Sequence, residues 1–264
     1  MNTLSARIEG IGFWSNGLPT WPAACVFAAT GALEPAAAAK PSPLLLAPNE
    51  RRRAPESVAV ALEVAHAACT DAGREPSTLP SVFASTHGDL AITDYMCATL
   101  AGDPRAVSPT KFHNSVHNAA AGYWTIGSGC VHATTAVSAF DASFAQGLLE
   151  ALVQIATGTD AVLLTAYDAT AVGPLGPMSN SRGLLGGALV LSARSESARG
   201  GGAHLRATLV DGEAPQGSGA LAQQAAGNAM APMLPLFDAL AIGADLALLK
   251  AGPKRILRVE LAHD

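Results

Sequence analysis

Two closely spaced histidines could do chemistry in this sequence if they shared a ligand or a proton. His113 and His117 are four residues apart, and His132 follows further along the chain. On one helix the first two would share a face, as two metal ligands must. No carboxylate accompanies them, and Asn114 stands where a zinc protease carries its glutamate base. We therefore expect structural or interface histidines and no metal site.

Cys130 is the candidate nucleophile, because it follows Gly127, Ser128 and Gly129 and has histidines nearby in the sequence. A cysteine attacks as the thiolate and needs an oriented base. No feature of the sequence shows that a base converges on it, so we expect a core thiol. Four carboxylates are likewise expected to be solvated or to cap the ends of elements: Asp141, Glu150, Asp160 and Asp168.

Motifs and charge exclude several classes of function. The sequence has no glycine-rich dinucleotide loop, P-loop, metalloprotease motif or nucleophile elbow, so we expect no cofactor. The net charge of −5, with Arg51–Arg53 as the one basic run, argues against nucleic acid. The four cysteines show no CxxC spacing, and no apolar run reaches the roughly 20 residues that span a membrane. We expect a cytoplasmic protein with reduced thiols.

The composition predicts an unusually apolar surface. Charged residues make up 14% of the chain, against about a quarter in an ordinary globular domain. Burial of a large face in a permanent complex would explain this shortage. A general richness in alanine and glycine is the alternative explanation.

The periodicities predict strands alternating with helices, and therefore an α/β layered fold. Helical spacing follows Pro55 and ends at Gly73. Two continuous apolar runs are typical of strands buried on both faces, Asp160–Tyr167 and Leu184–Ser192. Two alternating runs predict edge or half-exposed strands, Leu205–Val210 and Ile256–Leu261. The remaining predictions are two helices and one linker: Ala136–Ala156, Met233–Leu249 and Arg194–Ala203.

One segment carries a family resemblance. The run from Phe112 to Trp124, FHNSVHNAAAGYW, resembles the stretch that precedes the nucleophile in β-ketoacyl synthases. An opening glycine-rich strand, a helix ending at Gly73 and the two buried strands follow the order found in that family. The resemblance covers about Ile8 to Ser192.

The resemblance implies a thiolase-like half, a layered α-β-α fold with a mixed five-stranded sheet. We expect residues 1–264 to form one such domain, in which 192–264 are a shortened C-terminal portion. Enzymes of this family condense an acyl group held on a cysteine with malonyl carried by an acyl carrier protein. Two histidines, or a histidine pair with a lysine, assist the decarboxylation.

The sequence departs from that family pattern in two ways. At the start of the expected long helix, the position of the nucleophile holds Thr135, or Thr134 with a slip of one residue. A threonine hydroxyl is far less acidic than a thiol and would need an adjacent base to attack. The catalytic histidines of the family come from a second half, and the last part of this chain holds the isolated His204 and His263.

The two departures indicate a non-catalytic partner. The family includes chain length factors, which pair with an active ketosynthase and limit product length, and this chain resembles those of aryl-polyene-type pathways. Its side chains would close the end of the partner's acyl channel. The candidates at the channel or interface are Phe112, His113, Asn114, His117, Trp124, Phe140 and Phe144. Phe112 and Phe140 are preferred, because they flank the motif and the altered nucleophile position.

Two other functions remain open from the sequence. The chain could be a shortened acyltransferase or synthase in its own right, using Cys130, Thr134 or Thr135. It could also be a scaffold that keeps the fold without an acyl channel. Activity of the isolated chain would favour the first alternative, and complex formation without an effect on product length would favour the second.

Overall fold

A single mixed sheet forms the frame of the protein. The computed structural model describes residues 3–193 and 202–263. The sheet has eight strands in the order β3-β2-β4-β5-β1-β6-β8-β7, so the expectation of five strands is wrong. The strands are β1 (Thr3–Ser15), β2 (Ser81–Ala84), β3 (Thr134–Val137), β4 (Ala161–Asp168), β5 (Leu185–Ser192), β6 (Ala203–Asp211), β7 (Leu246–Gly252) and β8 (Arg255–His263). β2 is parallel to β3 and β4, and all other neighbours are antiparallel.

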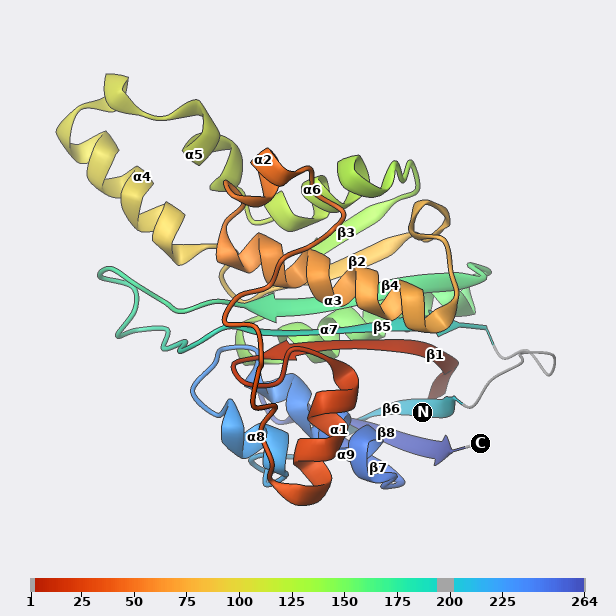
Figure 1. Cartoon of the computed structure of the whole chain (residues 1–264). Coiled ribbons are helices and arrows are strands. Elements are labelled where there is room, and N and C mark those ends of the chain that lie inside the picture. Colours follow the sequence, from red (N-terminus) through yellow and green to blue (C-terminus); the bar gives the residue numbers. More distant parts are fainter. Residues whose placement is uncertain (1–2, 194–201, 264) are drawn as a thin grey trace.

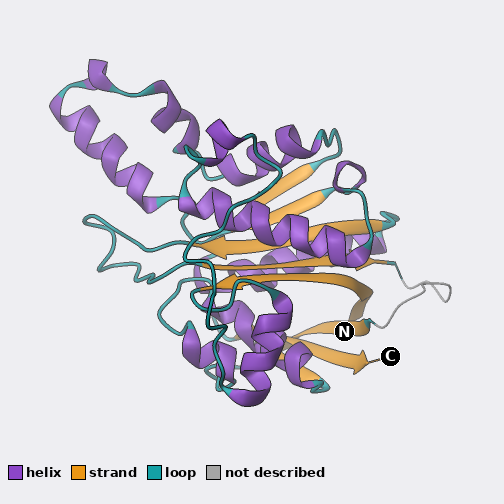
Figure 2. Cartoon of the chain, in the orientation of Figure 1, coloured by secondary structure: helices purple, strands orange, loops and turns teal. Residues whose placement is uncertain are grey.

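Helices cover both faces of the sheet, which gives the expected α-β-α layering (Figures 1 and 2). The helices are α1 (Trp21–Thr30), α2 (Pro48–Arg51), α3 (Glu56–Ala72), α4 (Leu90–Gly102), α5 (Pro109–Asn114), α6 (Ala119–Ser128), α7 (Ser143–Ala156), α8 (Ala220–Gln224) and α9 (Leu234–Ile242). One buried cluster holds side chains of α3 and α6, and the other those of α7, α9 and α1. Within the described residues, no helix is both long and apolar enough to cross a membrane.

The centre of the sheet follows the sequence pattern. β4 and β5 are buried at every position, as predicted for strands covered on both faces. α3 packs against this centre and ends at Gly73, whose φ of 61° is left-handed. A Cβ on Gly12 of β1 would lie 2.0 Å from the carbonyl oxygen of Val64 in α3. Glycine is therefore required there by the close approach of α3 to β1.

The predicted long helix Ala136–Ala156 is wrong over its first seven residues. Thr134–Val137 form β3, and α7 begins only at Ser143. The strand exists because it pairs in parallel with β2, more than fifty residues earlier in the chain. A hydrogen bond of 2.9 Å between the hydroxyl oxygens of Ser81 and Thr134 supports this pairing. A local helical pattern cannot register such a distant partner.

The C-terminal portion extends the sheet beyond β1. The two predicted alternating strands are present as β6 and β8, and both are half-exposed but lie inside the sheet, with β7 at the edge. The predicted helix Met233–Leu249 is too long: α9 ends at Gly243, with φ 68°, and Leu246 begins β7. Of the predicted linker Arg194–Ala203, residues 194–201 lie outside the described part of the chain.

Arg74 ties three elements together at the end of α3. Its guanidinium donates to both carboxylate oxygens of Glu9 in β1, at 2.7 and 2.9 Å, and to Asp160 before β4 at 3.1 Å. The arginine lowers the pKa of Glu9 below its usual value. Glu9 is therefore held as the carboxylate in a partly buried position, and a two-pronged contact of this kind is stronger than a single ion pair.

Replacing Arg74 with methionine removes the contact with Glu9 and is expected to lower the free energy of unfolding at pH 7 by about 1 kcal/mol. The loss is no larger because a third of the arginine side chain is exposed, and water weakens the ion pair there. The folded-state pKa of Glu9 is lowered, so this stabilisation is present above the usual glutamate pKa of about 4.3. It is lost as the pH falls through the lower folded value. Urea unfolding at several pH values measures both effects. Arg255→Met, which removes an exposed ion pair with Asp211, is the control and should change stability by under about 0.5 kcal/mol.

Candidate functional site

A strand, a sharp turn and a helix follow one another around Phe140. β3 ends at Val137, a short 3-10 helix covers Phe140–Ala142, and α7 follows directly. Phe140 has a φ of +50°, and among the described residues only Lys254 shares a positive φ without being glycine. This conformation costs a bulky residue about 1–2 kcal/mol. The turn therefore holds the phenylalanine in a position that its own backbone preference opposes.

Four hydrogen bonds hold the turn in place. The hydroxyl oxygen of Ser143 accepts the N–H of Ala139 at 2.9 Å and donates to the carbonyl oxygen of Phe140 at 2.6 Å. The hydroxyl of Thr86 donates to the same carbonyl at 3.3 Å, and Ser138 donates to the carbonyl of Thr86 at 3.0 Å. These bonds satisfy the backbone while 76% of the Phe140 residue surface stays exposed. The structure thus presents an aromatic ring to solvent on a rigid turn.

The loop after β2 is anchored beneath this turn by Asp168, at the end of β4. Its buried carboxylate accepts hydrogen bonds from the hydroxyl of Ser85 at 2.7 Å and from the backbone N–H groups of Thr86 and His87 at 3.0 and 3.3 Å. Burial raises the pKa of Asp168, and the bonds from Ser85 and Thr86 oppose that rise. Asp168 has no solvent-facing oxygen to offer a substrate, so its role is to fix the loop.

The two histidines of the motif do not act as a pair. α5 ends at Asn114 and α6 begins at Ala119, so His113 and His117 do not share a helix face. His117 donates from Nε2 to the carbonyl oxygen of Ser85 at 2.9 Å. His113 packs edge-on against the Tyr123 ring, with 5.7 Å between centroids. Both make separate contacts, and the residues that the structure describes contain no cluster of His, Cys, Asp or Glu able to hold a metal ion.

The three candidate nucleophiles lie away from the turn. Cys130 is buried, and its thiol donates to the carbonyl oxygen of Leu79 at 3.4 Å. Thr134 and Thr135 lie within β3, opposite Ser81 and Val82 of β2. The residue at the turn before the long helix is therefore Phe140. A hydrocarbon ring can neither attack a thioester nor hold an acyl group.

The aromatic candidates separate into two buried and two exposed residues. Trp124 lies in the core beneath α3, 6.3 Å from the Phe83 ring, and Phe144 lies in the core of the opposite layer. Phe112 and Phe140 are 62% and 76% exposed. Phe112 belongs to the arm of α4 and α5 that projects from the sheet (Figure 1). Asn114 is buried, and its Oδ1 has no hydrogen-bond partner.

β3 forms one edge of the sheet, and no strand among the described residues pairs with its outer side. The carbonyls of Ala133 and Val137 accept N–H groups at the ends of β2, so alternation turns the backbone of Thr134 and Ala136 outward. Exposed apolar residues precede and follow the strand in the sequence. Val131, before the strand, is 94% exposed, and Phe140 lies after it. A bare edge next to exposed apolar groups is a template for pairing with another chain.

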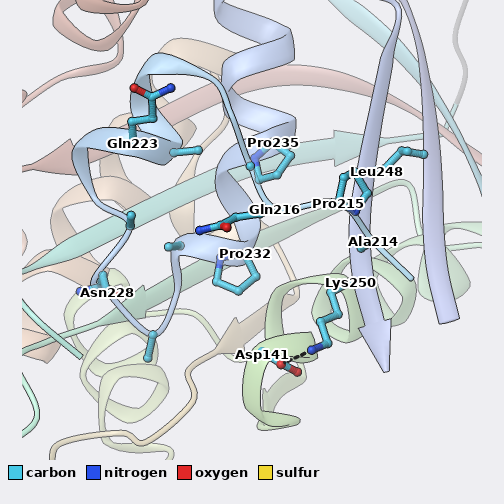
Figure 3. A pocket seen from close by; sticks show the side chains of 15 residues that line it. Asp141, Ala214, Pro215, Gln216, Gln223, Asn228, Pro232, Pro235, Leu248 and Lys250 are labelled. Carbon is cyan, nitrogen blue, oxygen red and sulfur yellow. Dashed lines mark ion pairs between the residues drawn. The ribbon is translucent and has the colours of Figure 1, made fainter. Parts of the chain in front are cut away.

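A pocket of about 480 Å³ lies beside the turn, toward the C-terminal portion. Figure 3 shows Asp141, the residue after Phe140, paired with Lys250 of β7 at one end of this pocket. The sequence analysis named Asp141 only as a solvated or capping carboxylate, and the side chain is about half exposed. It did not single out Lys250, which follows a segment expected to be helical. The β-branched run TTAV and the serine at 143 were the local signals of a strand and a helix start.

The chain is similar to known proteins in its family model and in its fold. The family model "Beta-ketoacyl synthase, N-terminal domain" matches residues 27–232. None of the curated proteins matches the chain.

Among solved structures, the ketosynthase ApeO in complex with its chain length factor ApeC from Xenorhabdus doucetiae matches with a TM-score of 0.71 at 19% identity, covering 98% of this chain and 97% of that one. The ishigamide ketosynthase/chain length factor matches with a TM-score of 0.71 at 15% identity and coverages of 98% and 99%. The type II polyketide synthase complex AntDE:AntF gives 0.72 at 11% identity, with coverages of 98% and 99%. These likenesses establish a thiolase-like fold of nearly the same length as the chains matched.

Proposed function

The chain belongs to the β-ketoacyl synthase family, and we propose that it acts as the chain-length-factor-type partner of an active ketosynthase. The observation that carries this proposal is Phe140, a non-nucleophilic side chain on the rigid strand–turn–helix junction. We place the nucleophile-equivalent position of the fold at Phe140, in place of Thr134 or Thr135. The chain then contributes shape, and its partner contributes the reacting cysteine.

The β3 edge supports a heterodimer. An unpaired strand beside exposed apolar side chains is unstable against association, and pairing with a strand of the ketosynthase would cover both. The low charged fraction of 14% fits a surface that is largely buried in an assembly. The matched structures include two whose names give a ketosynthase with a chain length factor. The partner surface that we propose therefore comprises β3 with Val131 and Phe140.

The proposed mechanism is steric. The exposed Phe140 ring would enter the end of the acyl channel of the partner and stop its extension. Because the turn is held by four hydrogen bonds, the ring would meet a growing chain as a fixed wall. The substrate would be an acyl chain delivered by an acyl carrier protein, and the resemblance to the aryl-polyene type makes polyenes the product class that we propose. The cytoplasmic location remains a prediction.

Co-expression with the active ketosynthase, followed by purification through a tag on one subunit, tests this function. We expect a one-to-one complex that elongates carrier-bound acyl chains, whereas this chain alone transfers none. Cys130→Ser should leave the activity of the complex unchanged, because the thiol is buried and contacts only a carbonyl among the hydrogen-bond partners described. A chain that is active alone and loses activity in Cys130→Ser would overturn the proposal in favour of an independent enzyme.

A further inference from the structure

An ion pair connects the Phe140 turn to the C-terminal portion of the sheet. The ammonium nitrogen of Lys250 in β7 lies 2.5 Å from Oδ2 of Asp141, the residue directly after Phe140. Figure 3 shows the two side chains meeting at one end of the pocket. Asp141 raises the pKa of Lys250, so the lysine stays charged. The pair therefore joins a residue of the strained turn to a strand more than one hundred residues later.

A second contact attaches the same strand to the helix that follows the turn. Gln146 in the first turn of α7 donates from Nε2 to the carbonyl oxygen of Ala251 at 2.7 Å. Lys250 and Ala251 are neighbours in β7, so one short stretch of this strand contacts both the turn and the helix. Such a double attachment limits how far the turn can move relative to the sheet.

The four hydrogen bonds of the turn hold its backbone, whereas the side chain of Asp141 borders a pocket. Both Asp141 and Lys250 line the 480 Å³ space, so well-packed apolar side chains do not surround the carboxylate. The hydrogen bonds of Ser143 hold the backbone of Ala139 and Phe140, and they do not contact the Asp141 side chain. A strained φ persists only where its surroundings hold it. Among the described residues, the Asp141 carboxylate is held by its ion pair with Lys250.

We infer that Lys250 is a positioning residue, which fixes the direction of the Phe140 ring by anchoring Asp141. This inference rests on the proposed function for its consequence, product length, but its structural part stands on the contacts above. It also gives the C-terminal strands a role in this fold: β7 supports the turn from the side that adjoins the pocket. An exposed ion pair of this kind contributes little to global stability, so its effect should be local.

The test compares Lys250→Met with Lys250→Arg in the full chain. Arginine keeps the charge, whereas methionine keeps the length and removes it. By hydrogen exchange, we expect residues 138–146 in Lys250→Met to exchange about two- to fivefold faster, with little change elsewhere. Because both side chains are about half exposed, 1 M salt should reduce the difference from wild type. Lys250→Arg should restore slow exchange.

In the complex, Lys250→Met should broaden the products toward longer chains, and Lys250→Arg should restore the wild-type distribution. Arg255→Met, which breaks an exposed ion pair between β8 and Asp211 of β6, is the matched control and should change neither measurement. Unchanged exchange over 138–146 in Lys250→Met would overturn the positioning role. Faster exchange with unchanged products in both Lys250→Met and Phe140→Ala would instead contradict the proposed function and leave the positioning role supported.

Discussion

Replacing Phe140 with alanine is expected to lengthen the products of the ketosynthase complex by at least one two-carbon unit. Phe140 is 76% exposed in the isolated chain and lies on a turn fixed by Ser143 and Thr86, so movement of the backbone cannot replace the bulk of its ring. Removing it leaves space at the end of the channel that an extended acyl chain can fill. Mass spectrometry of the carrier-bound or released products measures the shift.

Phe140→Gly separates function from stability at the same position. Glycine adopts a positive φ without steric strain, so this variant should raise the free energy of unfolding by about 0.5–1 kcal/mol while it lengthens the products. A side chain with a purely structural role would not give this opposite pair of effects. Val26→Ala, which shortens a 55% exposed side chain on α1, is the control and should leave product length unchanged. Wild-type products from both Phe140 variants in intact complexes would contradict the steric mechanism.

Replacing Ala136 with proline is expected to weaken the complex about 100-fold or more. By alternation, the N–H of Ala136 faces the outer side of β3, and proline has no N–H to donate across that edge. The bonds of β3 to β2 come from the neighbouring positions, so the chain should still fold. Proline on the outer side of an edge strand is also a means by which natural sheets prevent pairing. Co-purification and analytical ultracentrifugation of the mixed subunits measure the loss.

Ala136→Val is the matched variant, because it adds a larger side chain and keeps the N–H group. If the complex forms by strand pairing, valine should have a small effect and proline a large one. If both variants weakened the complex equally, the interface at Ala136 would depend on side-chain packing and not on strand pairing. An Ala136→Pro variant that is folded, as judged by its thermal transition, and still binds with full affinity would exclude β3 as the interface.

The elements with strong local patterns were predictable. The runs around Val162 and Leu189 are apolar at nearly every position, and such strands are stable only when covered on both faces. The helix ending at Gly73 has regular spacing and a left-handed terminus. Among the aromatic candidates, the sequence analysis preferred Phe112 and Phe140, which the fold leaves exposed, but it could not show that Trp124 and Phe144 are buried. Burial depends on what packs against a residue, and the sequence does not specify this locally.

The sequence by itself determined the α/β class and the family. These follow from residue identity and from hydrophobic spacing, which are local. Only the tertiary structure decided that Thr134–Val137 form an edge strand, because that strand exists through hydrogen bonds to β2. Because residues 134–137 belong to β3, α7 begins only at Ser143, and Phe140 lies on the turn between the two elements. The contact between Asp141 and Lys250 likewise joins distant segments, and such contacts appear only when the chain has closed on itself.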